Sequence, residues 1–392
     1  MKKGWKRRSY FRLQLIVFSL VSASFTNIYI TQPVLPVLQQ EFATDMVTVS
    51  FTVSAVILGI AISILPFGFL ADRWPIRPII LAGGVMIFSG GILCALITHL
   101  WFFIGVRFLQ GLFIPALTSC LAAYLATTLP VERLNVVMGS YVSATVLGGL
   151  GGRLLGGWIH PPLHWRYAFV SASIFILIAT LAAMSGLPQG RAGLQRNQRS
   201  VHFLEMLRSW TYLRIFLCAA GSFSIFSSIF NYMPYRLTEA PFYFSTELTT
   251  LIYLVYIIGV FMGPAVGRSC NRFGSGTMML AGTGLLGISL AVILLPNILA
   301  VVSGLFGFCT GFFTIHAAAI GSLNRRLSGG HGRANALYVL FYYTGGWLGI
   351  TVSGLAYKES GWGAVVFTGM ALLSIPLVAG MGERKFERNP NR

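Results

Sequence analysis

The chain has 392 residues, of which 55% are hydrophobic and only 10% are charged. About a quarter of the residues in a soluble domain are charged, so this composition excludes an ordinary soluble protein and indicates a lipid environment. The formal net charge of +18 could suggest nucleic-acid binding. However, the basic residues lie in short gaps between apolar stretches of about 20 residues, each long enough to cross a bilayer. We therefore expect a membrane protein without a nucleic-acid partner.

The N-terminus resembles a signal peptide, because basic residues precede an apolar run. The run continues to Leu38, which is too long for a cleaved leader. We expect a retained first span, with cleavage after Ala23 or Ser24 as the alternative. The predicted spans in chain order are residues 13–39, 47–70, 79–98, 101–125, 135–159, 166–187, 212–237, 248–266, 277–295, 298–321, 334–357 and 362–381.

Positive charge is distributed unevenly between the two sides of these spans. Of the 28 Lys and Arg residues, 22 lie in the two tails and the even-numbered loops, whereas only Arg166, Arg236 and Lys358 lie in the odd-numbered loops. Loops rich in Lys and Arg stay in the cytoplasm. The asymmetry predicts a multi-pass protein of the cell inner (plasma) membrane with both termini in the cytoplasm.

A polar stretch near the middle of the chain divides the spans into two sets of six. The sets match in order: Arg133 precedes the fifth span as Arg333 precedes the eleventh, and Trp165 opens the sixth as Trp362 opens the twelfth. We predict an all-α membrane protein with twelve transmembrane helices in two pseudo-symmetric halves, residues 1–187 and 212–392, joined by a cytoplasmic linker at 188–211. Parallel duplicated halves are typical of transporters with a site at the membrane midplane.

Residues 68–73, Gly-Phe-Leu-Ala-Asp-Arg, resemble the loop motif of the major facilitator superfamily, and the resemblance covers essentially the whole chain. The second copy, at residues 267–274, has Asn271 in place of the acid. The resemblance implies that Asp72 latches onto the start of helix eleven, or onto Arg333, when the cytoplasmic side is closed. A solvated loop acid is the alternative. The gating candidates, with Asp72 mattering more than Asn271, are Asp72, Arg73, Arg77, Arg133, Asn271, Arg272 and Arg333.

Residues 107–111, Arg-Phe-Leu-Gln-Gly, resemble the fourth-span motif of the same superfamily. The glycines of the fifth span resemble the motif of drug:proton antiporters, although Arg153 stands where Pro is usual. Together with Gln-Pro-Val-Leu-Pro at residues 32–36, they indicate the YnfM-type branch. Because glycine lets a neighbouring backbone approach closely, we expect helix packing at Gly148, Gly152 and Gly156.

None of the ten acidic residues falls inside a predicted span, whereas Arg107 and Arg153 lie well inside spans and Arg214 lies near the end of one. The membrane therefore offers no partner to a cationic drug. Arg107 and Arg153 each need an acceptor, and the candidates are Gln32, Gln110, the backbone carbonyls near Pro33, or an anionic substrate. The alternatives are snorkelling of Arg153 to the periplasmic interface and a structural hub at Arg107.

His316 is the one histidine clearly inside a predicted span, and histidine is the side chain that titrates near neutral pH. It is either a satisfied packing residue or the proton-coupling group. Amide and aromatic side chains of both halves are expected to line a cavity around the substrate. The candidates are Asn27, Gln32, Arg107, Gln110, Arg153, Asn231, Tyr235, Tyr338, Tyr342 and Trp347.

We expect a monomeric, proton-linked carrier in the lipid bilayer that moves a small organic molecule, with efflux by an antiporter favoured. The alternative is uptake or export of an anionic solute, such as a carboxylate siderophore, without a membrane carboxylate as proton carrier. An intramembrane enzyme is a remote alternative, because only a Ser–His pair using His316 could act inside the bilayer. No two of the five cysteines have metal-ligand spacing, so we expect no metal site and no cofactor.

Overall fold

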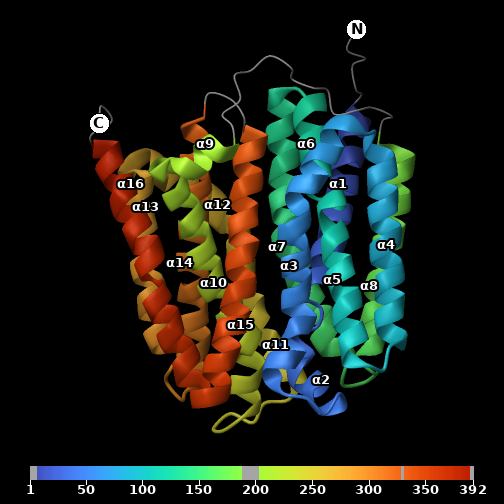
Figure 1. Cartoon of the computed structure of the whole chain (residues 1–392), viewed down its shortest axis with the longest axis vertical. Coiled ribbons are helices and arrows are strands. Elements are labelled where there is room, and N and C mark those ends of the chain that lie inside the picture. The colour runs from blue at the N-terminus through green and yellow to red at the C-terminus, as the bar shows by residue number, and fades with distance from the viewer. Residues whose placement is uncertain (1–6, 188–202, 328–330, 389–392) are drawn as a thin grey trace.

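The computed structural model describes residues 7–187, 203–327 and 331–388, and every regular element within them is a helix (Figure 1). Most of the predicted linker at 188–211 lies outside the described residues. The elements are α1 (Arg7–Tyr29), η1 (Gln32–Val34), α2 (Leu35–Glu41), α3 (Met46–Arg73), α4 (Ile76–Leu96), α5 (Leu100–Leu117), α6 (Ser119–Thr128), α7 (Val131–Ile159), α8 (Arg166–Gly186), α9 (Phe203–Arg208), α10 (Trp210–Thr238), α11 (Thr246–Leu251), η2 (Ile252–Ile257), α12 (Ile258–Phe273), α13 (Ser275–Val292), α14 (Ile298–Arg325), α15 (His331–Leu372) and α16 (Ser374–Arg388).

Ten segments of the described chain are long and apolar enough to cross a membrane. The last of them, residues 331–388, makes two passes, because the backbone leaves the helical conformation at Ser360 and Gly361. Gly361 has a φ of 69°, which favours glycine. The 29-residue helix α7 runs beside α1 and adds one more pass. The described residues therefore form the twelve membrane-crossing helices that the sequence predicts.

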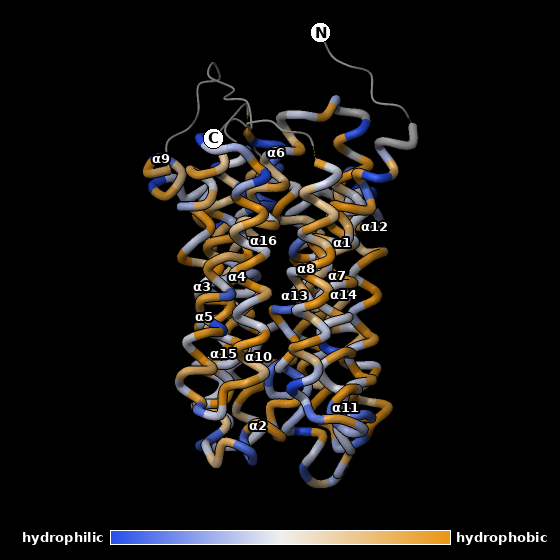
Figure 2. Tube along the Cα trace, turned by 90° about the vertical axis from the view of Figure 1, so that its right-hand side faces the viewer, coloured by the Kyte–Doolittle hydropathy of each residue, from blue (hydrophilic) through white to orange (hydrophobic). Residues whose placement is uncertain are grey.

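The outer surface of the bundle is apolar, as contact with lipid requires. Large side chains at mid-helix positions face outward, among them Phe261 and Phe367, each 63% exposed, and Ile178, 61% exposed. Figure 2 shows hydrophobic residues along the height of the bundle and hydrophilic residues gathered towards its two ends. In lipid the backbone polar groups have no water to bond, so a bundle of helices satisfies them internally.

Two equivalent close contacts support the internal duplication. An added Cβ at Gly148, Gly152 or Gly156 of α7 would lie within 2.4 Å of a carbonyl oxygen in residues 22–30. In the second half, a Cβ at Gly345 or Gly349 of α15 would lie within 2.4 Å of a carbonyl oxygen of α10. Each half thus holds one helix against another through glycines one turn apart, which is the packing expected at the three glycines of α7.

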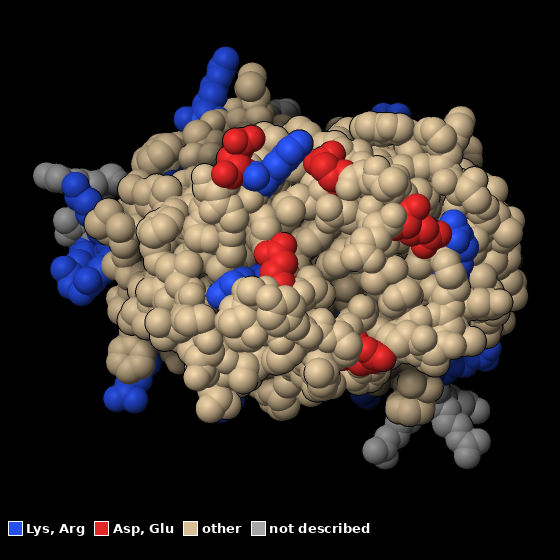
Figure 3. All heavy atoms as spheres, turned by 90° about the horizontal axis from the view of Figure 1, so that it is seen from below, with Lys and Arg blue, Asp and Glu red and all other residues tan. Residues whose placement is uncertain are grey.

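The start of α1, the end of α16 and α9 lie at one end of the bundle, here called the tail end, and α2 and α11 lie at the opposite, far end (Figure 1). The halves contact each other through α3 with α15, α7 with α11, and α10 with α2. Near the far end Lys358 Nζ lies 3.8 Å from Asp45 Oδ1, and Asn231 Nδ2 donates to Ser50 Oγ at 3.0 Å. Figure 3 views this end, where scattered acidic groups have basic side chains beside some of them.

Asp45 connects the halves at the far end and also caps α3. Burial raises the pKa of Asp45, but hydrogen bonds from the Thr48 hydroxyl and from the backbone N–H groups of Val47 and Thr48, together with Lys358, lower it by more. The folded pKa therefore lies below the ordinary value. Since it is depressed, the stabilising contribution of Asp45 is complete above the ordinary pKa and is lost as the pH falls through the folded value.

We expect the far end to loosen when Asp45 is protonated, at pH values below about 4. Spin labels at Ala43→Cys and Glu359→Cys would report a broader distance distribution at low pH, and the native cysteines are buried, which keeps the labelling selective. Asp45→Asn should show the broader distribution at neutral pH. An unchanged distribution in that variant would contradict the role of the carboxylate.

Candidate functional site

Arg153 of α7 is buried where the two halves meet, with 2% of its surface exposed. Its Nε donates to Gln32 Oε1 at 2.6 Å, and its Nη atoms donate to the Gly149 carbonyl at 2.8 Å and to the Tyr256 hydroxyl at 2.9 Å. Gln32 lies on η1 in the first half and Tyr256 on η2 in the second. The guanidinium therefore joins the halves and is not at the aqueous surface.

Three tyrosine rings surround this guanidinium. The ring centroids of Tyr29, Tyr256 and Tyr253 lie 3.9, 4.2 and 5.3 Å from Arg153 Cζ. We call these three residues the tyrosine box. No ion pair joins Arg153 to an acid among the residues that the structure describes. A desolvated cation–π contact contributes up to about 2 kcal/mol and a hydrogen bond to a charged group about 1.5–3 kcal/mol. These contacts offset the burial of the cation but leave its charge unneutralised.

Arg107 of α5 has a different environment, although it too is fully buried. Its nitrogens donate to the Thr52 carbonyl at 3.0 Å, to Gln110 Oε1 at 2.7 Å and to the Ile28 carbonyl at 2.9 Å. Gln110 in turn donates to the Ile87 carbonyl at 2.9 Å. All of these partners belong to the first half. The geometry favours the structural hub, since this arginine ties α1, α3, α4 and α5 together.

His316 of α14 is partly buried among aromatic rings of the second half. The Tyr338 hydroxyl is 2.9 Å from His316 Nδ1, and the ring of Tyr342 lies 5.3 Å from the imidazole. On the other side the imidazole stacks on Phe312, whose ring lies 3.8 Å from Phe226. Phe226 is in turn 5.3 Å from Tyr256. Ring contacts thus run continuously from the histidine to the tyrosine box.

The other cavity candidates occupy buried or partly buried positions in both halves. Asn27 donates to the backbone of its own helix, whereas Asn231 bonds Ser50 across the halves. Tyr235 is 3% exposed, and its hydroxyl has no hydrogen-bond partner in the described part of the chain. Trp347 is partly buried and packs against the hydrophobic core. Of these, Asn231 is the residue that the structure brings to the contact between the halves.

The predicted gating residues lie on the tail-end side, and their role stays a prediction. The exposed members are Asp72, Arg73, Arg133, Asn271, Arg272 and Arg333. Arg77 donates to the Leu187 carbonyl at 2.7 Å, a contact within the first half. The guanidinium of Arg333 lies 5.9 Å from the ring of Phe203 on α9, between the two halves of the sequence.

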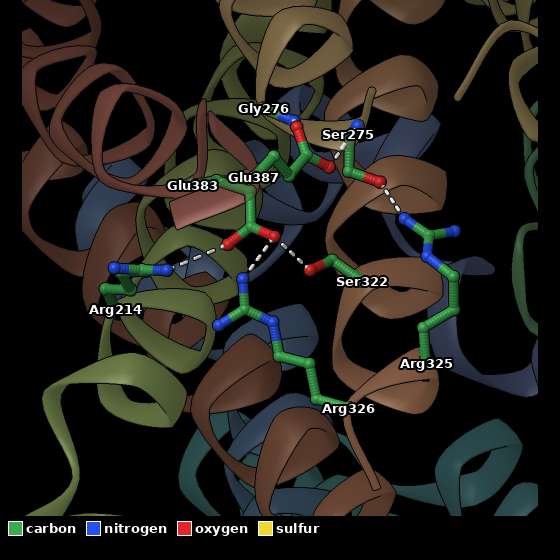
Figure 4. Close-up of polar contacts among 8 residues, drawn as sticks. All are labelled: Arg214, Ser275, Gly276, Ser322, Arg325, Arg326, Glu383 and Glu387. Carbon is green, nitrogen blue, oxygen red and sulfur yellow. Dashed lines mark hydrogen bonds and ion pairs between the residues drawn. The ribbon is translucent and has the colours of Figure 1, made fainter. Parts of the chain in front are cut away.

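The prediction that no carboxylate falls inside a span is wrong for Glu383. The last helix does not end near residue 381 but continues to Arg388 as α16, and Glu383 is 1% exposed. Its carboxylate accepts hydrogen bonds from Arg214 Nη2 at 3.1 Å, from Arg326 Nη2 at 2.5 Å and from the Ser322 hydroxyl (Figure 4). These four residues, the Glu383 cluster, join α10, the end of α14 and α16.

A second acid of α16 extends this connection to α13. Glu387 accepts hydrogen bonds from the backbone N–H groups of Ser275 at 2.7 Å and Gly276 at 3.1 Å, where α13 begins (Figure 4). Arg325 donates to the Ser275 hydroxyl. An available signal was Arg214, because an arginine inside a span requires a buried acceptor. The tyrosine box gave no such signal, since tyrosines in spans commonly serve as packing or interface residues.

The comparison with known families agrees with this architecture. The model of the Major Facilitator Superfamily matches residues 17–320. The chain belongs to the major facilitator superfamily. Its fold is that of superfamily transporters: it matches a bacterial homologue of the human lysosomal transporter Spinster with a TM-score of 0.78 at 14% identity, over 98% of this chain and 99% of that one. The nucleoside transporter NupG matches with a TM-score of 0.75 at 12% identity, over 95% and 99% of the two chains.

Relatives within the superfamily are transporters as well. The inner membrane transport protein YnfM of Escherichia coli is 28% identical over 375 residues, which cover 95% of this chain and 90% of YnfM. The MFS-type transporter YybF of Bacillus subtilis is 27% identical over 90% of this chain and 89% of its own. A chloramphenicol resistance protein of Pseudomonas aeruginosa is 27% identical over 91% and 86%. The protein is therefore a multi-pass membrane transporter of this superfamily and not an enzyme.

Proposed function

We propose that the protein is a proton-coupled secondary transporter that exports a small organic molecule across the inner membrane by alternating access, acting as a monomer. The contact between Arg153 and Tyr256 carries this proposal. It places a buried charge on the boundary between two six-helix halves, so any rocking of one half against the other changes the surroundings of that charge.

The charge distribution supports an orientation with the tail end in the cytoplasm. Of the 28 basic residues, 22 lie in the tails and in the loops that the sequence assigns to that side. At the far end Arg166 pairs with Glu41 at 2.6 Å, and Lys358 lies 3.8 Å from Asp45. Basic residues near the far end are thus few and partly neutralised, as expected of a periplasmic surface.

The pair of His316 and Tyr338 is the proposed site of proton coupling. A neutral imidazole accepts one hydrogen bond and donates another, so a proton gained at His316 changes its bonding to the Tyr338 hydroxyl. The pair is connected through ring contacts to the tyrosine box. Protonation would thereby reach the boundary between the halves. The relative named for chloramphenicol resistance supports export as the direction of transport.

Flux into proteoliposomes under an imposed pH gradient tests this function. We expect the gradient to drive uptake of a solute from a panel containing chloramphenicol and 2-naphthoate. His316→Ala should reduce the gradient-driven rate by about tenfold or more, because the group that couples the proton is lost. His331→Ala, at an exposed histidine, is the matched control and should retain the rate. Equal gradient dependence in the two variants would exclude His316 as the coupling group.

A further inference from the structure

We propose that Arg153 and the tyrosine box bind the carboxylate of a planar aromatic monoanion. This inference rests on the proposed transport function and specifies the chemical class of the cargo. It starts from a buried cation whose partners are all neutral: an amide oxygen, a carbonyl oxygen and a phenolic hydroxyl. A guanidinium has five N–H groups, and the described residues use three of them on Arg153. A carboxylate would take the remaining donors and neutralise the charge.

Unpartnered hydroxyl groups lie next to the two segments that bind the guanidinium, one just before η1 and the other on α11, which leads into η2. Thr31 precedes Gln32, and Thr249 lies four residues before Tyr253. Both threonines are fully buried, and neither hydroxyl has a partner in the described part of the chain. Their segments contact each other, since α11 packs against η1. A buried polar group without a partner is costly, so these hydroxyls indicate a site completed by a polar ligand group.

The single available cation limits the charge of the ligand. Arg107, like Arg153, donates from all three nitrogens, but every one of its acceptors belongs to the first half. Arg153 is therefore the one membrane arginine, among the described residues of the first half, that faces the second half. A polyanion such as a carboxylate siderophore would leave further charges without partners at this depth. The geometry favours one carboxylate.

Buried aromatic rings beside the tyrosine box indicate the rest of the ligand. Tyr256 packs against Phe226, and Phe226 against Phe312, with ring-centroid distances of 5.3 and 3.8 Å. Aromatic rings prefer to pack against other rings in offset or edge-to-face geometry. An anion with a flat aromatic body would place its carboxylate at Arg153 and its ring among these side chains. An aliphatic acid of similar size lacks that second contribution.

Binding of three matched probes to the full chain in lipid nanodiscs tests the inference. The probes are 2-naphthoate, its neutral analogue 2-naphthamide, and the aliphatic anion octanoate. We expect 2-naphthoate to bind at least about tenfold more tightly than either of the others, because 2-naphthamide lacks the charge and octanoate lacks the aromatic ring. Arg153→Gln should abolish the preference for naphthoate over naphthamide. Tyr256→Leu should reduce the preference for naphthoate over octanoate, whereas Tyr256→Phe should keep it.

Arg166→Gln is the control for loss of a positive charge, since Arg166 pairs with Glu41 near the far end. It should leave both preferences unchanged. Arg153→Lys, which keeps the charge, serves if the Gln variant does not fold, and should retain part of the preference for the anion. Equal affinity of the wild-type protein for naphthoate and naphthamide would overturn the inference. If a neutral solute were still transported, the proposed transport function would stand even though the anion site was overturned. If naphthoate bound but no solute were transported, the transport function would be overturned and the anion site would stand.

Discussion

Replacing Glu383 with glutamine should lower the free energy of unfolding by about 3–5 kcal/mol, the usual cost of removing one partner from a buried ion pair. The carboxylate side chain is 2% exposed, and the side chains of Arg214 and Arg326 are 9% and 11% exposed. Without the acid, two guanidinium groups stay close together with no negative charge between them. The loss therefore exceeds that of a surface pair, which is about 0–1 kcal/mol.

Unfolding of the purified protein in detergent, followed by tryptophan fluorescence, measures this effect. Glu359→Gln removes an exposed acid and should leave stability unchanged. Adding Arg326→Gln to Glu383→Gln should cost less than the two single changes together, because it removes one of the two unbalanced charges. Additive effects in this double-mutant cycle would show that the residues do not act as a cluster.

Gly152→Ala should destabilise the first half by about 1–3 kcal/mol, the range for inserting atoms into a tightly packed interface. An added Cβ would lie 2.3 Å from the Thr26 carbonyl oxygen, so α1 and α7 would have to separate. At the neighbouring Gly151 the nearest atom to an added Cβ is the Thr26 hydroxyl oxygen at 3.9 Å, an ordinary van der Waals contact. Gly151→Ala is therefore expected to be neutral or slightly stabilising, because alanine favours the helix.

The two alanine variants form a matched pair in the same turn of the same helix. Their unfolding midpoints in detergent, together with their expression in membranes, measure the difference. One further variant, Gly349→Ala, tests the equivalent contact of the other half: its added Cβ meets the Ser224 carbonyl oxygen, and it should be as damaging as Gly152→Ala. Similar midpoints for Gly151→Ala and Gly152→Ala would mean that helix contact does not depend on these glycines.

Much of the fold follows from the sequence, because the membrane enforces simple rules. Long apolar runs must be helices, and an even number of them places the start of α1 and the end of α16 at the same end of the bundle (Figure 1). The acceptors of the two membrane arginines were also among the predicted candidates, since Gln32 and Gln110 lie near enough in depth. Membership of the major facilitator superfamily was predicted from the resemblance of short motifs.

Other parts required the three-dimensional arrangement. The sequence becomes polar near residue 381, where the last helix was expected to end, but Glu383 on α16 is buried by partners 169 and 57 residues away in the chain. Tyr253 and Tyr256 lie on η2, a 3₁₀ segment with three residues per turn, which stacks them on one face. An α-helix also places residues three apart on one face, but no helical period indicates that this face meets Arg153 of the other half.

Under the proposed binding of an anion at Arg153, the two halves would contribute unequally to the site, because η2 belongs to the second half and the charged group to the first. Gln32 and the Gly149 carbonyl move with Arg153, because all three belong to the first half, whereas Tyr253 and Tyr256 belong to the second. Parting the halves at the far end strips the guanidinium of two aromatic faces and admits water. Under the proposed function, an anion would be bound tightly while the far end is closed and weakly once it opens, and by reciprocity the bound anion would favour the closed form. In proton-coupled export, the free energy for release at the far end would then come from the proton.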